Sequence, residues 1–414
     1  MTRRAWCLAA AAAIGLSACG GTSHTSSGAH ATAAQSTAAP STAAPASGSR
    51  AVTGQLVGVT FGGPVLTGAV NLDRQLDAAV ANGVESLRVE INWSQIQPYA
   101  SASAVPAGAR SQFQDGGGIP TRFAQLDPIV AGAAARGLSL LPVVEYTPSW
   151  DALRPGDGAS PPRDPTAYAR FLTALIGRYG PNGSFWGSHP SLPRVPIRMW
   201  QIWNEPHFTS YWSARPFAPG YVKLLTAAHA AIKAADPGAK VVLAGLAEFS
   251  WQYLEQIYRV AGAKGQFDVV AIHPYTAQPA GVVTILQRDR AVMERFGDGA
   301  KPILATEVTW PSSEGKAPPQ FGVSTTEQQQ AARLGQLMPL LEAQRTKLGL
   351  MGFYWYTWIG DETRRAAPDA FDFAGLEKYV DGTVSSKPAL GVFKHWALSL
   401  EGCRRKTTGT SCAP

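Results

Sequence analysis

Eight short apolar runs recur along the chain, and this recurrence limits most strongly the folds that the chain can adopt. Each run is nearly continuous in Val, Ile, Leu and aromatic residues, as in a strand that is buried on both faces of a parallel sheet. The runs cover residues 55–61, 84–91, 138–146, 197–203, 240–246, 267–273, 301–307 and 349–358. They predict a large and well-buried parallel sheet.

Helical patterns lie between these runs. In residues 71–83 and 121–137 apolar side chains recur on one helical face, and each stretch ends at a glycine suited to a helix C-terminus, Gly83 or Gly137. Further stretches of this kind cover 165–179, 219–235, 250–262, 281–296, 325–345 and 388–400.

Alternating strands and helices predict the fold class. Eight strand–helix units indicate an α/β protein built as a (β/α)8 TIM barrel, with one domain over residues 55–400. A doubly wound sheet is the alternative. However, GVTFGGPV at residues 58–65 lacks the glycine spacing of the phosphate-binding turn that such sheets usually carry.

The N-terminus has the pattern of an export signal. Arg3 and Arg4 precede a short apolar run and then small residues, and the run is too short for a stable membrane span. LSAC, residues 16–19, resembles the bacterial lipobox, in which the cysteine is lipidated. The resemblance implies a signal peptide at 1–18, a lipid on Cys19 and an extracytoplasmic protein anchored to the membrane at the cell surface. A plain secretory signal is the alternative.

Two terminal segments flank the predicted domain. Residues 19–54 follow the signal and are rich in Ala, Ser, Thr and Pro, so they bury too little apolar surface to fold and form a flexible tether. Cys7 leaves with the signal and Cys19 would carry the lipid. Cys403 and Cys412 then remain as a disulfide pair in a tail at 401–414.

Charge and motif content exclude several classes of function. The net charge of +7 is a mild excess without an extended basic block, so no nucleic-acid partner is expected. No G-x-S-x-G, no H-E-x-x-H and no clustered Cys/His set occurs, and the seven histidines are scattered. We therefore expect neither a metal nor another cofactor, and we expect a monomer.

Polar residues stand where the predicted strands end, which is where a barrel carries its active site. Asn204 and Glu205 follow the fourth run, and Glu307 ends the seventh. Hydrolysis of a glycosidic bond needs two carboxyl groups with different pKa values, one acid and one carboxylate. Arg88, within the second run, can keep one of them ionised.

These motifs carry a resemblance to a known group of enzymes. IWNEP at 202–206, followed by ILATEVTW at 303–310, resembles the retaining glycoside hydrolases of clan A, which use a (β/α)8 barrel. The resemblance implies that Glu205 is the acid/base and Glu307 the nucleophile. It also implies that Asn204 contacts the 2-hydroxyl of the sugar.

Other motifs extend the resemblance over about residues 55–400. SLRVEINW is similar to the second strand of the clan, so Arg88 would orient Glu307, although a structural ion pair is the alternative. HPY at 273–275 is similar to the sixth-strand His-x-Tyr. Tyr275 would then bond to Glu307 and His273 would contact the substrate, unless His273 is a core residue.

The eighth strand would supply an aromatic platform for the sugar. Trp355 or Trp358 would take this role, but strand alternation points them to opposite faces, so at most one need face the sugar. Within the clan, MWQIWNEPH is most like family 39, whereas LRVEINW and HPY fit family 5 equally well.

The sequence thus predicts a retaining glycoside hydrolase that cleaves O-glycosidic bonds of an oligo- or polysaccharide by double displacement. The long connections at 92–120 and 147–165 favour a substrate groove. Glu145 and Glu248 also lie near strand ends and are interpreted as substrate contacts or loop charges. The alternatives are a non-catalytic carbohydrate-binding lipoprotein and a transglycosylase that remodels a cell-surface glycan.

Overall fold

The computed structural model describes residues 57–320, 322–363 and 366–401. The predicted signal peptide at 1–18, the tether at 19–54 with Cys19, and the Cys403–Cys412 pair lie outside these residues and stay predictions. No helix among the described residues has the length and apolar character that a membrane crossing requires.

A parallel barrel forms the centre of the described chain. Around the sheet its strands follow the order β7-β6-β5-β2-β1-β10-β9-β8. The strands are β1 Val57–Phe61, β2 Ser86–Asn92, β5 Ser139–Glu145, β6 Met199–Ile202, β7 Lys240–Val242, β8 Val270–Ile272, β9 Ile303–Val308 and β10 Leu350–Trp355. Backbone bonds such as Leu243 N–H to Val269 O, 2.9 Å, join the ends of the order and close the ring.

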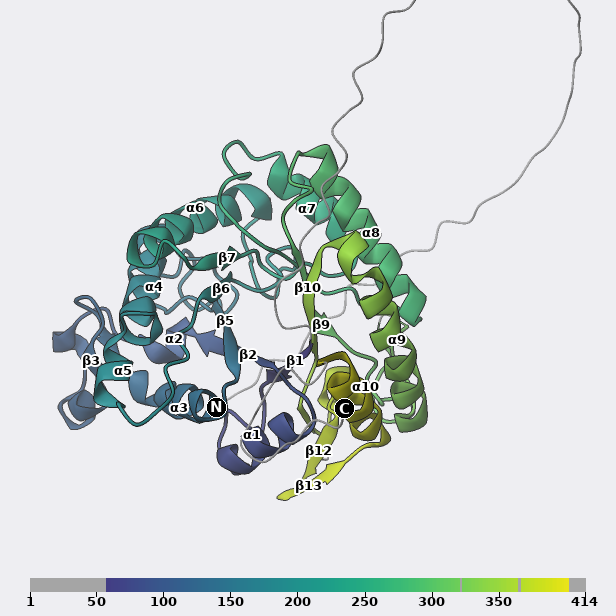
Figure 1. Ribbon diagram of the computed structural model, residues 1–414. Coiled ribbons are helices and arrows are strands. Elements are labelled where there is room, and N and C mark those ends of the chain that lie inside the picture. The colour runs from purple at the N-terminus through teal and green to yellow at the C-terminus, as the bar shows by residue number, and fades with distance from the viewer. Residues whose placement is uncertain (1–56, 321, 364–365, 402–414) are drawn as a thin grey trace, which may run out of the picture. The chain divides into compact units, whose positions relative to one another are not determined.

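Helices surround this ring (Figure 1). They are α1 Leu72–Ala81, α2 Trp93–Ile96, α3 Asp127–Ala135, α4 Pro165–Tyr179, α5 Ser184–Ser188, α6 Phe217–Ala235, α7 Ser250–Tyr258, α8 Pro279–Arg295, α9 Glu327–Leu348 and α10 Pro388–Glu401. Every predicted strand and helix has its counterpart, so the predicted (β/α)8 barrel is confirmed. Gly83 and Gly137 have φ angles of 81° and 66°, the left-handed conformation expected of residues that end a helix.

Several short elements were not predicted. They are the hairpin β3 Gln114–Asp115 with β4 Pro120–Thr121, the small sheet β11 Ile359–Asp361, β12 Glu377–Val380 and β13 Thr383–Ser386, and 3-10 helices at Ala102–Ala104, Ala107–Gln112, Phe123–Gln125 and Ala370–Phe373. The hairpin also explains why α3 begins at Asp127 rather than at 121. Thr121 pairs with Gln114 in β4, and Pro128 then suits the first helical turn.

Apolar residues fill the barrel as well as the layer between sheet and helices. The lumen cluster consists of Leu141, Val242, Val269, Ala271, Leu304 and Tyr354. Gly58 of β1 leaves room for the tyrosine ring, because a Cβ at that position would lie 2.4 Å from Tyr354. Along β2 the lumen-facing positions run Ser86, Arg88 and Glu90, so polar groups replace apolar ones toward the carboxyl ends of the strands.

Candidate active site

The backbone at the carboxyl ends of three neighbouring strands adopts left-handed conformations. Tyr146 (φ 65°) follows β5, Trp203 (φ 69°) and Glu205 (φ 40°) follow β6, and Glu248 (φ 51°) lies in the connection after β7. Each such non-glycine residue costs about 1–3 kcal/mol, and these residues cluster at functional sites. The backbone N–H of Glu205 donates to Gly245 O at 3.2 Å, which ties this turn to the next strand connection.

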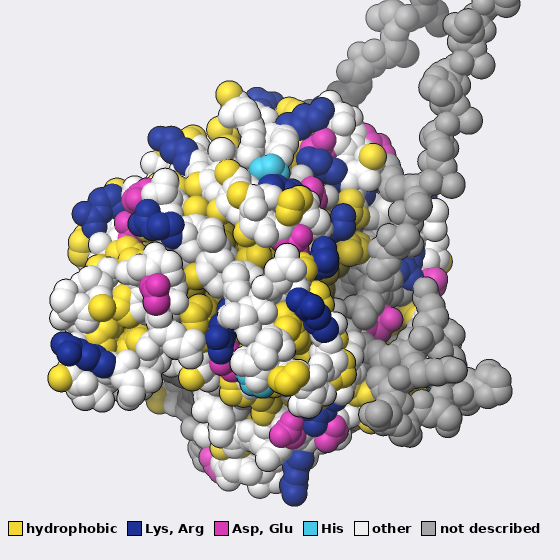
Figure 2. Space-filling view, turned by 60° about the vertical axis from the view of Figure 1, so that its left-hand side comes forward, with side chains coloured by type: hydrophobic (Ala, Val, Ile, Leu, Met, Phe, Trp, Pro, Cys, Tyr) yellow, Lys and Arg dark blue, Asp and Glu magenta, His cyan; other side chains and the backbone are white. Residues whose placement is uncertain are grey.

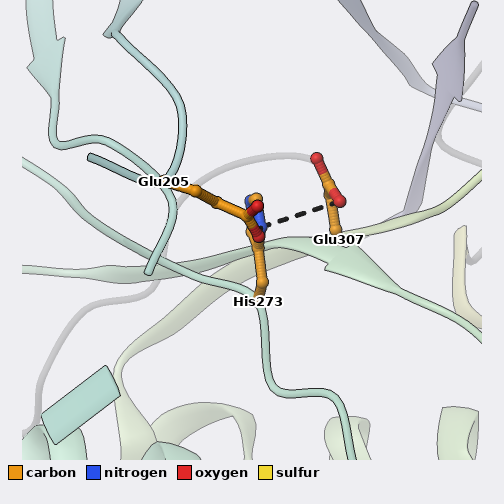
Figure 3. Close-up of side chains that lie close together, drawn as sticks. All are labelled: Glu205, His273 and Glu307. Atoms are coloured by element: carbon orange, nitrogen blue, oxygen red, sulfur yellow. Dashed lines mark hydrogen bonds and ion pairs between the residues drawn. The ribbon is translucent and has the colours of Figure 1, made fainter. Parts of the chain in front are cut away.

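Glu205, His273 and Glu307 converge at this rim (Figure 3). Glu205 follows β6 and Glu307 belongs to β9, and on the shorter way round the ring β7 and β8 lie between them. One side-chain O or N atom from each residue lies within 4.8 Å of those of the other two. His273 Nδ1 forms a 2.7 Å hydrogen bond to Glu205 Oε1 and lies 3.6 Å from Glu307 Oε2.

Arg88 connects three polar residues of the site. The buried guanidinium donates from Nη1 to Glu307 at 2.7 Å, from Nη2 to Asn204 Oδ1 at 2.8 Å and from Nε to Gln201 Oε1 at 2.8 Å. The contact that the resemblance implied between Arg88 and Glu307 is therefore present. Because a guanidinium only donates, Asn204 faces it with its oxygen and keeps its amide N–H groups for another acceptor.

The two residues of the HPY motif take different positions. The Tyr275 hydroxyl donates to Glu307 Oε2 at 2.5 Å, so the implied contact is again present. His273 is fully buried, and it contacts Glu205 instead of lying open to a substrate. Gly245 packs against its other ring nitrogen, since a Cβ there would lie 2.0 Å from His273 Nε2. His273 thus stands behind the carboxylates.

The two tryptophans expected to form a sugar platform are fully buried. Trp355 Nε1 donates to Ala374 O at 3.1 Å, and Trp358 Nε1 donates to Gln75 of α1 at 2.8 Å. Both belong to the core between sheet and helices, so neither offers an open ring face and the structure does not support the expected platform. Tyr356, which stands between them, is half-buried.

Further side chains of the site were missed from the sequence. Tyr146, Tyr211 and Tyr356 are half-buried, and the charge of Glu205 or Glu307 contributes to raising the pKa of each beyond the effect of burial. Gln201 had a signal, because it is the one polar residue in strand β6, MWQI. Tyr211 lies in an irregular connection and had no signal at all.

The surroundings move the pKa values of the two central carboxyl groups in opposite directions. Burial raises the pKa of Glu205, and the hydrogen bond from His273 offsets this only in part. Burial also acts on Glu307, but the charges of His273 and Arg88 and the hydrogen bonds from Tyr275 and Arg88 outweigh it and lower the pKa. One group therefore favours the acid and the other the carboxylate, the division of roles typical of paired catalytic carboxyls.

A hollow lies between the two long connections that were predicted to shape a groove. It measures about 330 Å³ and is lined by Ser94, Pro98, Thr147, Ser149, Ala152, Gly156, Asp157 and Gly158. The Ser94 N–H donates to Tyr146 O at 3.0 Å and joins the two connections at its edge. A lining of hydroxyls, small residues and one carboxylate suits a polar ligand.

Among the described residues, Glu205, His273 and Glu307 are the group whose geometry could hold a metal ion. Both oxygens of Glu307 already accept hydrogen bonds, from Arg88 and from Tyr275. A guanidinium beside the carboxylate supplies the compensating charge, so these donors suit reaction with an organic substrate better than a cation site.

Comparisons with known proteins identify the fold. No protein-family model and no curated protein matches the sequence. A family 39 glycoside hydrolase from the gut symbiont Bacteroides cellulosilyticus WH2 has 16% identity and a TM-score of 0.57, over 82% of this chain and 63% of that one. This chain thus spans less than two thirds of that enzyme.

Two further solved structures are similar. A glucosidase from Croceicoccus marinus has 16% identity and a TM-score of 0.56, over 84% of this chain and 68% of that one. GH5_18 from Streptomyces cattleya, in complex with GlcNAc, has 15% identity and a TM-score of 0.56, over 88% and 83%. At such identities the likeness shows the fold, a barrel that this chain shares with glycoside hydrolases of families 39 and 5.

Proposed function

We propose that this protein is a retaining glycoside hydrolase that acts on an oligo- or polysaccharide, with Glu307 as nucleophile and Glu205 as acid/base. One observation carries the proposal: carboxylate oxygens of the two residues lie within 4.8 Å of each other, while their pKa values move in opposite directions. Retaining enzymes hold the two carboxyl groups about 5–5.5 Å apart, whereas inverting enzymes need roughly 6.5–9.5 Å.

In the first step Glu307 attacks the anomeric carbon of the sugar. The bond from that carbon to the leaving oxygen breaks, and Glu205 transfers its proton to this oxygen, so the leaving part departs as an alcohol. A covalent ester then links the sugar to Glu307. Arg88 and Tyr275 hold the attacking carboxylate in place through their hydrogen bonds.

In the second step water releases the sugar. Glu205, now a carboxylate, takes a proton from a water molecule whose oxygen attacks the anomeric carbon. The ester bond to Glu307 breaks, and both residues return to their first state. The hydrogen bond from His273 positions Glu205 in both steps.

The nucleophile is tested by trapping. A 2-deoxy-2-fluoro glycoside with a good leaving group should inactivate the enzyme, and peptide mapping should place one adduct on Glu307. Glu307→Gln should form no adduct. An adduct on another residue would refute the assignment.

The acid/base role is tested with aryl glycosides. Glu205→Gln should lower kcat by about 10²–10⁴-fold for substrates with poor leaving groups, and far less for substrates with good ones. A protein that only binds carbohydrate would show no turnover before or after the change. An equal loss for both kinds of substrate would contradict the role.

We also propose, from the sequence alone, that the enzyme is held at the cell surface by a lipid on Cys19. Radiolabelled fatty acid should be incorporated into the wild-type protein and not into Cys19→Ala. Incorporation into that variant would place the lipid elsewhere.

A further inference from the structure

A second pair of carboxyl groups lies on the lumen side of the rim. Glu90 is at a lumen-facing position of β2, and Glu145 ends the neighbouring strand β5, in register with Asn92. Glu90 is exposed at the mouth, whereas Glu145 is only 3% exposed. The proposed mechanism uses neither residue.

Few hydrogen bonds from the protein compensate the carboxyl groups of this pair for their position at the rim. Within the described part of the chain no hydrogen-bond donor reaches Glu145 Oε2, while Glu90 has a side-chain bond from Asn92. Arg88 attracts both carboxyl groups, but its hydrogen bonds go to Glu307, Asn204 and Gln201.

An uncompensated carboxyl group in this position needs a proton or a cation. A buried carboxylate without a partner is costly, and the like charge of Glu90 increases the cost. Burial and the neighbouring charge accordingly raise the pKa of Glu145 well above its usual range. A ligand cation beside Glu145 would supply the positive charge that stabilises its ionised form.

We propose that Glu90 and Glu145 bind the protonated amino group of an amino sugar in the substrate, so that the enzyme prefers glycans with free amines. This inference rests on the proposed function. An ammonium group offers three donors together with the missing positive charge, whereas a hydroxyl group offers a single donor and no charge.

The position of the pair fits such a subsite. The charges of Glu205 and Glu307 act on Glu145, so the amine would lie close to the reacting bond. Directly after Glu145 the chain continues through Tyr146 to Thr147, which lines the polar hollow of about 330 Å³. The backbone therefore connects the pair directly to one wall of this hollow.

Binding is measured by calorimetry in the Glu307→Gln background, which blocks turnover. The probes are oligosaccharides of glucosamine and of galactosamine, each compared with its N-acetylated form, which keeps the sugar and removes the charge. At least one free-amine probe should bind roughly tenfold tighter than its acetylated form, and the preference should fade as rising pH deprotonates the amine.

Variants locate the effect. Adding Glu145→Gln or Glu90→Gln should each weaken free-amine binding about tenfold or more and leave acetylated binding unchanged. Glu342→Gln on the outer helix α9 removes a charge of the same sign and should change neither. Arg88 is left unchanged in these variants, because it donates hydrogen bonds to Glu307 and Asn204.

Three outcomes overturn the inference. They are the absence of any free-amine probe that binds more tightly than its acetylated form, a preference that survives both substitutions, and calcium binding that Glu145→Gln abolishes. Any of these three outcomes in an enzyme that hydrolyses glycans and forms the adduct on Glu307 would keep the proposed function and refute this inference. Tight amine binding without any turnover by the wild-type protein would refute the proposed function and leave the amine-binding site in place.

Discussion

A single guanidinium joins three strand ends at the site. Arg88 on β2 reaches Gln201 and Asn204 at β6, and Glu307 on β9. Its charge is one of the causes that lower the pKa of Glu307, whereas burial raises the pKa of Glu205. Activity should therefore follow a bell-shaped pH profile, with Glu307 on the acidic limb and Glu205 on the basic limb.

Replacing Arg88 should change this profile as well as the rate. Arg88→Gln should lower kcat/KM by about 10²–10³-fold, because a charge-assisted donor to the nucleophile is lost. The acidic limb should also move to higher pH, since Glu307 then ionises less readily. Arg198→Gln, at an exposed arginine, serves as the control. An acidic limb that stays in place would show that Arg88 acts only on structure.

At the scale of elements, the connection after β7 helps to position Glu205, which lies in a different connection. Gly245 leaves the space in which the His273 ring reaches Glu205. A side chain at 245 would push the ring away, because its Cβ would lie 2.0 Å from Nε2.

Gly245→Ala should therefore reduce both stability and activity. Overpacking at a buried position costs about 1–3 kcal/mol of unfolding free energy, measured by urea denaturation. In the folded variant kcat should also fall, because Glu205 loses the hydrogen bond from His273. Gly187→Ala on α5 is the matched control, since a Cβ there meets no atom within 4 Å. Unchanged kcat in folded Gly245→Ala would contradict the coupling.

Two outer helices meet at a buried acid. Asp289 of α8 is fully buried, and Ser250 Oγ of α7 donates to its Oδ2 at 2.7 Å. Burial raises the pKa of Asp289 to about 8. Between the unfolded pKa near 4 and this value the folded state holds a proton that the unfolded state has released. The stabilising contribution is thus complete below about pH 4 and is lost as the pH rises toward 8.

Asp289→Asn should remove this pH dependence. An amide keeps the shape of the group and cannot ionise. Four pKa units at about 1.4 kcal/mol each make the variant more stable than wild type at pH 8 by up to about 5 kcal/mol, and the gain should shrink to about 1 kcal/mol at pH 5. Urea denaturation at both pH values measures the difference. Glu314→Gln, at an exposed position, controls for charge. A gain of equal size at both pH values would contradict the titration of Asp289.

At the scale of the whole molecule, the described surface shows little that would drive association. Large apolar side chains that are exposed come from separate elements: Leu66, Leu153, Phe249, Leu340 and Val380. On the face shown in Figure 2, basic and acidic side chains are interspersed rather than gathered by sign. Contiguous apolar patches are the usual mark of an interface.

We therefore predict a monomer in solution. Light scattering coupled to size-exclusion chromatography should give the mass of one chain at micromolar concentration. Addition of salt should not change this mass, because the large apolar side chains exposed on the described residues come from separate elements. A concentration-dependent dimer would contradict the prediction.

The sequence predicted the barrel and its central carboxyls because both depend on local patterns. Continuous apolar runs mark strands buried on both faces, and Glu307 stands inside such a run. The tryptophan prediction failed because β10 ends at Trp355, so strand alternation no longer applies at Trp358. Tyr211 was missed because the irregular connection after β6 has no periodicity.

The left-handed residues at the rim have a consequence for how heat-resistant this protein can become. Tyr146, Trp203, Glu205 and Glu248 hold backbone angles that glycine adopts freely. Replacing Glu205 by glycine would relieve this conformational cost, but it would also remove the acid that the mechanism needs. Substitutions that raise thermal stability without loss of activity are therefore expected on the outer helices and at the opposite end of the barrel. The rim keeps its conformational cost because activity depends on it.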